Sequence, residues 1–286
     1  MAIQLATKYL GYVDEVMKTA SALPLVTNDY FEFKEANVVK IYKIGIAPMQ
    51  DYSRNGVVDG NWSHYGAVTT LNAATEEMRL KKDRSFTFEI DKLDEDETVQ
   101  ALEAAEALNR QLREVVIPEV DLHVYNVMTA NAGHNPEAVS LTADNIYEAI
   151  TAGSEALDDA EVPEDGRFII VSPAVLRLMK LNEKIALNSD IGADLRKKGA
   201  VAMLDNAAVI KVTSKRLPEG FGFLYGHASA TVAPTKLADY KVHSDPPGLS
   251  GSLVEGRINY DAFVQENKAE ALYYQAVTTE GENTKL

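Results

Sequence analysis

The sequence predicts a mixed α+β protein, and three observations carry this prediction. Strand-like runs with alternating apolar residues fill residues 30 to 92, and a helical pattern of unusual length covers residues 99 to 130. Further strand-like runs follow residue 234. The chain has 286 residues, of which 46% are hydrophobic, so it can bury a sizeable core.

The composition excludes several classes of site and partner. The chain has no cysteine, which excludes disulfides, thiolate zinc sites, iron–sulfur clusters and cysteine nucleophiles. A net charge of -15 disfavours nonspecific adhesion to DNA. The same charge is compatible with a container for nucleic acid, because an acidic inner wall would keep the contents from sticking. Charges interrupt the N-terminal apolar residues and no apolar stretch reaches about 18 residues, so we expect neither a secretory signal nor a membrane span. These features predict a cytoplasmic location.

The first elements are an N-terminal helix and a long hairpin. Residues 3 to 20 place apolar side chains on one helix face, which predicts an amphipathic arm or an ordinary helix docked on its own domain. Residues 30 to 92 predict two long strands around a polar, flexible tip. Because an isolated hairpin is only marginally stable in water, a long one is expected to lie against something else. The turn candidates in the tip are Asn55-Gly56 and Asp59-Gly60.

A single long helix is predicted next. The acidic run LDEDETV at residues 93 to 99 suits the positive end of a helix dipole and lacks the loop of a calcium site, so it indicates a helix start. Apolar residues keep helical spacing from Val99 to Val127. Pro118 interrupts the pattern without changing its phase, which predicts a kink or a tight break within one helix.

The remaining segments predict an α/β region and then a return of strands. Thr142 is expected to cap a helix, RFIIVSP is typical of a buried strand, and Pro173 suits the first position of another helix. Three more strands are expected in LADYKVH, LVEGRINYDAFV and KAEALYYQAV. The second should have one polar and one apolar face, because Arg257, Asn259 and Asp261 alternate with Ile258, Tyr260 and Ala262.

The sequence lacks the motifs of common enzymes. Gly220 and Gly222 do not complete a dinucleotide fingerprint, and GLSGS at residues 248 to 252 lacks the final glycine of a nucleophile elbow. The five histidines are scattered, and none lies three or four residues from another, which argues against a metal site. Asp121 and His123 lie on diverging faces of the long helix, so a surface pair or a local hydrogen bond is expected there. We predict no catalytic, cofactor-binding or metal-binding residue.

The segment RLKKDR forms a basic cluster within an acidic chain and is the strongest candidate for a contact site. Two interpretations stay open: the charges protect a sheet edge from aggregation, or they pair with an acidic patch on a neighbouring copy. The only tryptophan, in the polar tip, is a further candidate. The predicted contact residues are Arg79, Lys81, Lys82, Arg84 and Trp62.

The order of the predicted elements and three local segments point to one protein family. The order is an arm, a long two-stranded excursion, a very long helix, an α/β domain and a late return of strands. The segments are EEMRLKKDRSFTFEIDKLDEDET, REVVIPEVDLHVYNVM and YDAFVQENKAEALYY. Together they resemble the major capsid (head) protein of tailed bacteriophages, in which such segments form the return of an extended loop, the spine helix and the C-terminal strand pair.

The resemblance implies a structural protein with no active site and no cofactor. It implies self-assembly as hexamers and pentamers into an icosahedral phage head around double-stranded DNA. Other copies of the chain would be its main partners, with scaffold and portal proteins as candidates, and it would reach the virion capsid after assembly in the host cytoplasm. The implied parts are an N-terminal arm (1–37), an extended loop or E-loop (38–92), a peripheral P-domain (93–134 and 234–266) and an axial A-domain (135–233 and 267–286).

Two alternatives stay open at this point. A bacterial nanocompartment shell of the same fold would enclose a cargo enzyme, and neighbouring genes for a portal or terminase would separate it from a phage head. An ordinary enzyme with an unrecognised site would form a small soluble oligomer that binds a metabolite.

Overall fold

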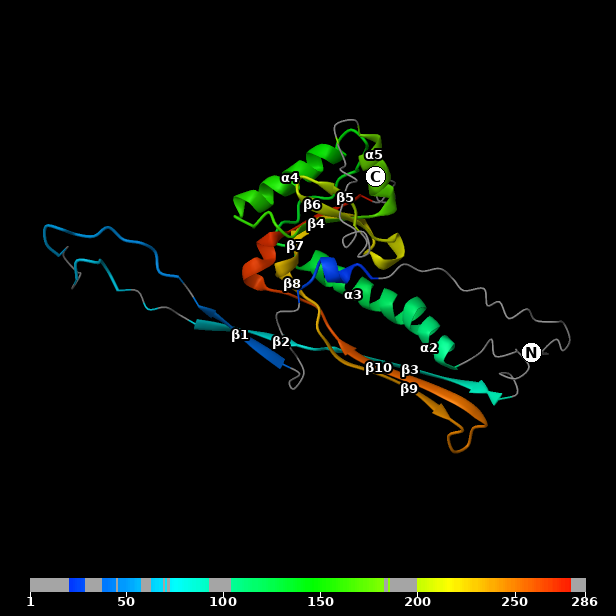
Figure 1. Ribbon diagram of the computed structural model, residues 1–286. Coiled ribbons are helices and arrows are strands. Elements are labelled where there is room, and N and C mark those ends of the chain that lie inside the picture. Colours follow the sequence, from blue (N-terminus) through cyan, green and yellow to red (C-terminus); the bar gives the residue numbers. More distant parts are fainter. Residues whose placement is uncertain are drawn as a thin grey trace, which may run out of the picture. The chain divides into compact units, whose positions relative to one another are not determined.

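The computed structural model has the mixed helix and sheet content that the sequence predicts, in two compact units (Figure 1). Unit 1 comprises Met1–Glu32 and Lys81–Leu286, and unit 2 comprises Phe33–Leu80. The predicted arm helix at residues 3 to 20, the acidic helix start, Asp59-Gly60 and Trp62 lie outside the described residues. The structure describes residues 21–28, 38–44, 46–57, 63–68, 70, 73–92, 104–182, 185 and 200–278.

Unit 2 contains an antiparallel hairpin of β1 (Val38–Ile44) and β2 (Ala73–Arg79). Lysines on β1 face glutamates on β2, with ion pairs of 2.5 Å for Lys40–Glu77 and 3.0 Å for Lys43–Glu76. Opposite charges across a strand pair favour this register. The predicted extended loop at 38–92 is longer than unit 2, because its last strand pairs within unit 1.

That strand, β3 (Lys82–Asp91), forms a three-stranded antiparallel sheet with β10 (Gly251–Tyr260) and β9 (Thr235–Ser244), in the order β3-β10-β9. The apolar face of this sheet packs against the helix that begins at Ala104, and Ile90 of β3 and Val254 of β10 are buried there with Ala104. The opposite face is charged, as the alternation of Arg257 and Ile258 predicts.

Gly256 lies at the centre of this sheet, and a Cβ atom there would lie 2.3 Å from the Phe86 ring and 2.9 Å from the Tyr240 ring. We expect Gly256→Ala to lower the free energy of unfolding by about 1–3 kcal/mol, because the two rings must shift. Urea unfolding followed by circular dichroism measures this change. Glu255→Ala on the exposed face is the control and should cost less than about 0.5 kcal/mol, so equal losses would contradict the crowding.

The predicted long helix is present and contains a π-helical segment. Over the described part, α2 (Ala104–Gln111) passes into a π-helical turn at Leu112–Val116 and then into α3 (Ile117–Ala130). The irregularity lies just before Pro118, as the kink prediction implies, because proline has no N–H for the carbonyl one turn earlier. The helix therefore changes its winding and remains one element.

The core of unit 1 is a five-stranded sheet in the order β12-β7-β4-β6-β5, in which only β4 and β6 are parallel. Alternate residues of the central strand face two hydrophobic clusters. Phe168 and Ile170 pack in the cluster that contains Tyr125 of α3, whereas Ile169 and Val171 pack with the helices α4 and α5. Figure 1 shows α3 on one side of this sheet and α4 and α5 on the other. The bounds are β4 Arg167–Val171, β5 Ala200–Leu204, β6 Ala207–Lys211, β7 Phe221–His227, β12 Leu272–Ala276, α4 Ile146–Asp159 and α5 Pro173–Leu181.

Local signals explain the start of α5 but not the start of α4. Ser172 caps α5 by accepting a bond from the Val175 amide at 3.3 Å, and Pro173 occupies the first helical position. Thr142 does not cap α4, which begins at Ile146. It forms a turn instead, in which its amide donates to the Asn145 side chain at 2.7 Å.

The strand predicted in LADYKVH is present as β9, whereas the other two C-terminal strands are shorter than predicted. Strand β10 ends at Tyr260, and β11 (Phe263–Val264) pairs separately with β8 (Thr231–Val232). The start of KAEALYYQAV is a 3₁₀ helix, Glu266–Ala271, before β12 completes the five-stranded sheet. Asp261, which was expected on the polar face, is buried at the turn between β10 and β11.

Candidate functional site

The described part of the chain carries no recognisable catalytic or metal constellation. No group of three or more His, Asp or Glu residues there could hold a metal ion. A cavity of about 610 Å³ beside α5 is lined mainly by apolar side chains such as Val175, Leu217 and Phe221. Its Ser172 hydroxyl already caps α5. None of the helices described is long and apolar enough to cross a membrane.

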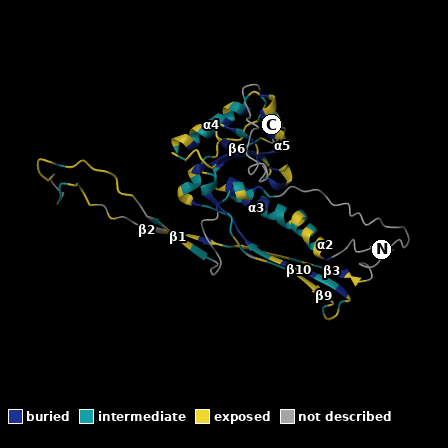
Figure 2. Ribbon diagram, viewed as in Figure 1, coloured by how far each residue is buried: buried dark blue, intermediate teal, exposed yellow. Residues whose placement is uncertain are grey.

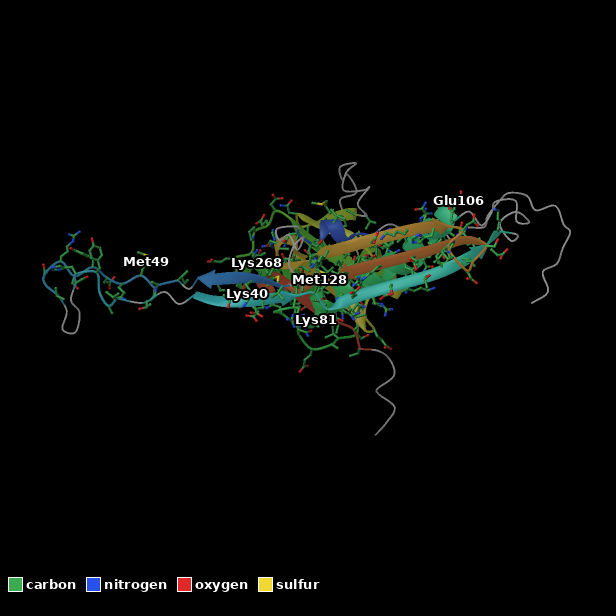
Figure 3. The ribbon with its side chains drawn as sticks, turned by 90° about the horizontal axis from the view of Figure 1, so that it is seen from below. Lys40, Met49, Lys81, Glu106, Met128 and Lys268 are labelled. Atoms are coloured by element: carbon green, nitrogen blue, oxygen red, sulfur yellow. The ribbon has the colours of Figure 1, made fainter. Side chains whose placement is uncertain are left out.

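The most unusual surface lies in unit 2, in residues 46–57 and 63–68, which we call the hairpin tip. Figure 2 shows it largely as exposed ribbon, and Figure 3 labels Met49 on it. Met49 is 100% exposed and Ile46 is 95% exposed. Large exposed apolar side chains that cluster on a surface are typical of interaction sites. The exposed large apolar residues of the tip are Ile46, Met49, Tyr52, Val57, Tyr65 and Val68.

Backbone and side-chain hydrogen bonds hold the two halves of the hairpin tip together. The Ser53 amide donates to the His64 carbonyl at 3.0 Å, and the His64 Nδ1 lies 2.6 Å from the Ser53 carbonyl. Nearby, the Gln50 side chain accepts a hydrogen bond from the Ala67 amide and donates one to the Ala67 carbonyl. These bonds join residues 50–53 to residues 64–67, within the segment that the sequence predicts to be a polar, flexible tip.

Aromatic contacts add to this shape. The Tyr52 ring lies edge-on to the Tyr65 ring with centroids 5.1 Å apart, and it contacts the His64 ring at 5.7 Å. Tyr65 nevertheless remains 80% exposed. The tip thus presents exposed aromatic side chains that contact one another across its two halves.

The predicted basic cluster is divided between the two units. Arg79 belongs to β2 of unit 2, and Lys81, Lys82 and Arg84 belong to unit 1; all four side chains are exposed. Arg84 is engaged within the chain, because its Nε donates to Glu119 Oε1 at 2.7 Å. Neither Lys81 nor Lys82 has an ion pair among the described residues. Their role in contacts stays a prediction, and Trp62 lies outside the described residues.

The expected surface pair of Asp121 and His123 is wrong, because each residue contacts a distant segment. Asp121 is 1% exposed, and its Oδ2 accepts from Arg216 Nη1 at 2.8 Å while its Oδ1 accepts from the Ser21 hydroxyl at 2.6 Å. Burial raises the pKa of Asp121, against the lowering effects of Ser21 and Arg216. His123 contacts Asp261. Sequence spacing along one helix carries no signal for partners so far away in the chain.

Comparison with known proteins shows which solved structures share this fold. The sequence matches no protein-family model and no curated protein. A structure from Mycobacterium phage Che8 aligns over 96% of this chain and 98% of its own, at 16% identity and a TM-score of 0.72. The capsid structure of the cyanophage P-SCSP1u aligns over 97% and 94%, at 13% identity and a TM-score of 0.69. The mature capsid of bacteriophage PhiM1 aligns over 97% and 93%, at 13% identity and a TM-score of 0.70.

The similarity extends over nearly the full length of both chains in each pair. At these identities it establishes the fold, which is that of phage capsid structures.

Proposed function

We propose that this protein is the major capsid subunit of a tailed phage. It self-assembles as hexamers and pentamers into an icosahedral head that encloses double-stranded DNA. The observation that carries the proposal is the match to phage capsid structures over 96% or more of this chain.

In this proposal the parts of the chain correspond to those of a capsid subunit. The hairpin of unit 2 is the core of the extended loop at 38–92, and the long helix is the spine helix. The three-stranded sheet lies in the P-domain (93–134 and 234–266), and the five-stranded sheet lies in the A-domain (135–233 and 267–286). Residues 1–37 are the N-terminal arm.

The physical basis of assembly is the surface that the subunit cannot bury by itself. An exposed apolar side chain gains about 1.5–3 kcal/mol when it is fully buried. Six such residues in the hairpin tip can supply this gain at each contact between subunits, and a closed shell repeats the contact many times. The net charge of -15 would keep the enclosed DNA from adhering to the wall. Scaffold and portal proteins are proposed partners, in the host cytoplasm and then in the virion.

Electron microscopy tests this function directly. The full chain is expressed alone and together with a candidate scaffold protein from a neighbouring gene, and the purified material is imaged in negative stain. We expect closed shells of uniform size in at least one of the two preparations. A compact monomer in both preparations would refute the proposal.

Charge reversal tests whether the basic cluster contributes to assembly. We expect Lys81→Glu with Lys82→Glu to reduce the particle yield at least about tenfold, because like charges across an interface cost several kcal/mol. Arg84 is left unchanged because of its bond to Glu119. The matched control is Arg177→Glu with Lys180→Glu, two exposed cations on α5. Normal yields from the Lys81 and Lys82 variant would assign these lysines to solubility.

A further inference from the structure

The dipeptide Asn55-Gly56, which the sequence predicts as a turn, is exposed in the hairpin tip. Asn55, Gly56 and Val57 are all exposed, and Asn55 lies in a turn that Gly56 follows. Gly56 has a φ of 128°, a backbone conformation that glycine adopts more readily than other residues. A Cβ atom built on Gly56 would have no other described residue within 4 Å, apart from its chain neighbours. The backbone of this dipeptide is therefore open to solvent.

The turn is attached to the rest of the hairpin tip through Ser53, two residues before Asn55. The Ser53 amide donates to the His64 carbonyl at 3.0 Å, and the Ser53 carbonyl lies 2.6 Å from His64 Nδ1. No hydrogen bond joins the Asn55 side chain to another residue in the described part of the chain. The fold thus holds Ser53 and leaves the Asn55 carboxamide able to rotate toward the backbone that follows it.

An asparagine followed by glycine can react with its own backbone. The Gly56 nitrogen loses its proton and attacks Asn55 Cγ, so a C–N bond forms and closes a succinimide ring. The bond from Cγ to Nδ2 breaks, and ammonia leaves. Water then opens the ring at either of its two carbonyl carbons. Cleavage at Cγ gives aspartate, whereas cleavage at the backbone carbonyl gives isoaspartate, in which the main chain continues through the former side chain.

Two features of the hairpin tip favour this ring closure. The attacking nitrogen must approach Cγ closely, and a side chain on the following residue would crowd that approach, whereas glycine has none. Ring closure also needs rotation of the Asn55 backbone and side chain, which the exposed turn permits without breaking a packed contact. The chain contains no second Asn-Gly dipeptide. Sequence and exposure therefore coincide at this one position.

We infer that Asn55-Gly56 is a site of spontaneous deamidation, at which the hairpin tip gains a carboxylate while it is open to water. Apart from His64, the charged side chains of the tip are Asp51 and Arg54, whose charges sum to zero. The reaction changes this sum to -1. It also places the new charge next to Val57, one of the exposed apolar residues of the tip.

The consequence for assembly rests on the proposed function. In that proposal a neighbouring subunit covers the hairpin tip, which restricts the rotation that ring closure needs, so assembled subunits keep Asn55. A carboxylate formed before assembly opposes burial of the tip, because an unpaired charge is costly to remove from water. The reaction therefore distinguishes subunits by the time that they spend unassembled.

Mass spectrometry of the full-length protein measures the reaction. Unassembled subunits, diluted below the concentration at which shells form, are incubated at mildly alkaline pH, which favours loss of the amide proton, and are then digested. The peptide with Asn55 should gain the mass of one amide-to-acid conversion, and chromatography separates its aspartate and isoaspartate forms. Asn206 is the internal control, since it is also exposed but precedes the buried Ala207 of β6, and it should stay unchanged.

A free peptide of residues 50–60 provides the reference rate. The folded subunit should react at a rate within about threefold of this peptide, because the exposed turn needs no opening before it reacts. A rate below that range would overturn the inference, because a site held closed by even about 1.4 kcal/mol reacts about tenfold more slowly. Asn55→Gln should stop the change, since attack on the longer side chain must close a larger ring. A mass gain that persists in this variant would also overturn the inference.

Purified shells separate this inference from the proposed function. Subunits in shells should react at least about tenfold more slowly than unassembled subunits, because the covered tip must first be released. Equal rates in the two preparations would contradict burial of the hairpin tip in an assembly and leave the inference standing. An unreactive Asn55 in the unassembled subunit would overturn the inference even if shells form.

Discussion

Replacing Ile46, Met49 and Tyr65 together with serine should abolish shell formation and leave the free energy of unfolding of unit 1 unchanged. These side chains are 95%, 100% and 80% exposed, so the folded subunit loses almost no buried area when they are removed. An interface that buries them loses about 1.5–3 kcal/mol for each residue. Light scattering measures the particles, and urea unfolding measures the stability of the subunit.

The control for this prediction is a second triple variant with the same chemistry elsewhere. Val115, Leu181 and Val242 are exposed apolar residues of unit 1, between 41% and 63% exposed. Their replacement with serine should leave shell formation close to that of the parent protein. Shells of normal yield from the tip variant would show that the hairpin tip is not an assembly surface.

Asp121→Ala should destabilise the subunit by about 3–5 kcal/mol, the range for breaking a buried ion pair. The change leaves the Arg216 guanidinium, which is 6% exposed, without the carboxylate 2.8 Å away. It also removes the acceptor of the Ser21 hydroxyl, which ties residues 21–28 to α3. Urea unfolding of the unassembled subunit at pH 7 measures the loss.

A double variant separates the contribution of the ion pair to stability from the cost of leaving Arg216 without the Asp121 carboxylate. Asp121→Leu with Arg216→Met should recover most of the loss, because a buried pair contributes little over apolar side chains of similar volume. The raised pKa of Asp121 agrees with this, since burial disfavours its charge more than its partners favour it. A double variant as unstable as Asp121→Ala would contradict this interpretation.

The raised pKa of Asp121 also determines whether its contribution to the free energy of unfolding rises or falls with pH. A carboxyl whose folded pKa is raised binds its proton more tightly in the folded state, so its contribution to stability is complete below the ordinary value of 3.8. That contribution declines as the pH rises through the raised pKa. Asp121→Asn should remove this part of the decline when unfolding is measured between pH 3.5 and 6. An unchanged slope would contradict the shift.

Elements with strong local signals are predictable from this sequence. The run RFIIVSP contains enough β-branched and aromatic residues to predict β4, and Ser172 and Pro173 mark the start of α5. The phase of the apolar residues across Pro118 predicts one helix with a local irregularity. In each case a few neighbouring residues determine the structure, so no knowledge of distant contacts is needed.

The features that the sequence does not reveal depend on contacts between residues far apart in the chain. Asp121 meets Arg216 across 95 positions, and Asp261 meets Lys81 across 180 positions. Helical periodicity places Asp121 and His123 on a helix, but it cannot name partners on other elements. Similarly, alternation predicts β3 as a strand, but its pairing with β10 decides that it belongs to unit 1.

The hairpin tip shows a different limit. Its many Asn, Asp, Gly and Ser residues predict polar turns, and Gly56 does adopt the positive φ of 128° that a glycine turn allows. The apolar residues among them are too widely spaced to form a periodic pattern. Only the folded hairpin shows that each of them is exposed.

Cryo-electron microscopy of the purified assembly tests the central claim most directly. We predict a closed icosahedral shell in which the side chains of Met49, Ile46 and Tyr65 are buried against an adjacent subunit. A shell with these residues facing solvent, or a protein that remains a monomer with and without its scaffold, would contradict the account.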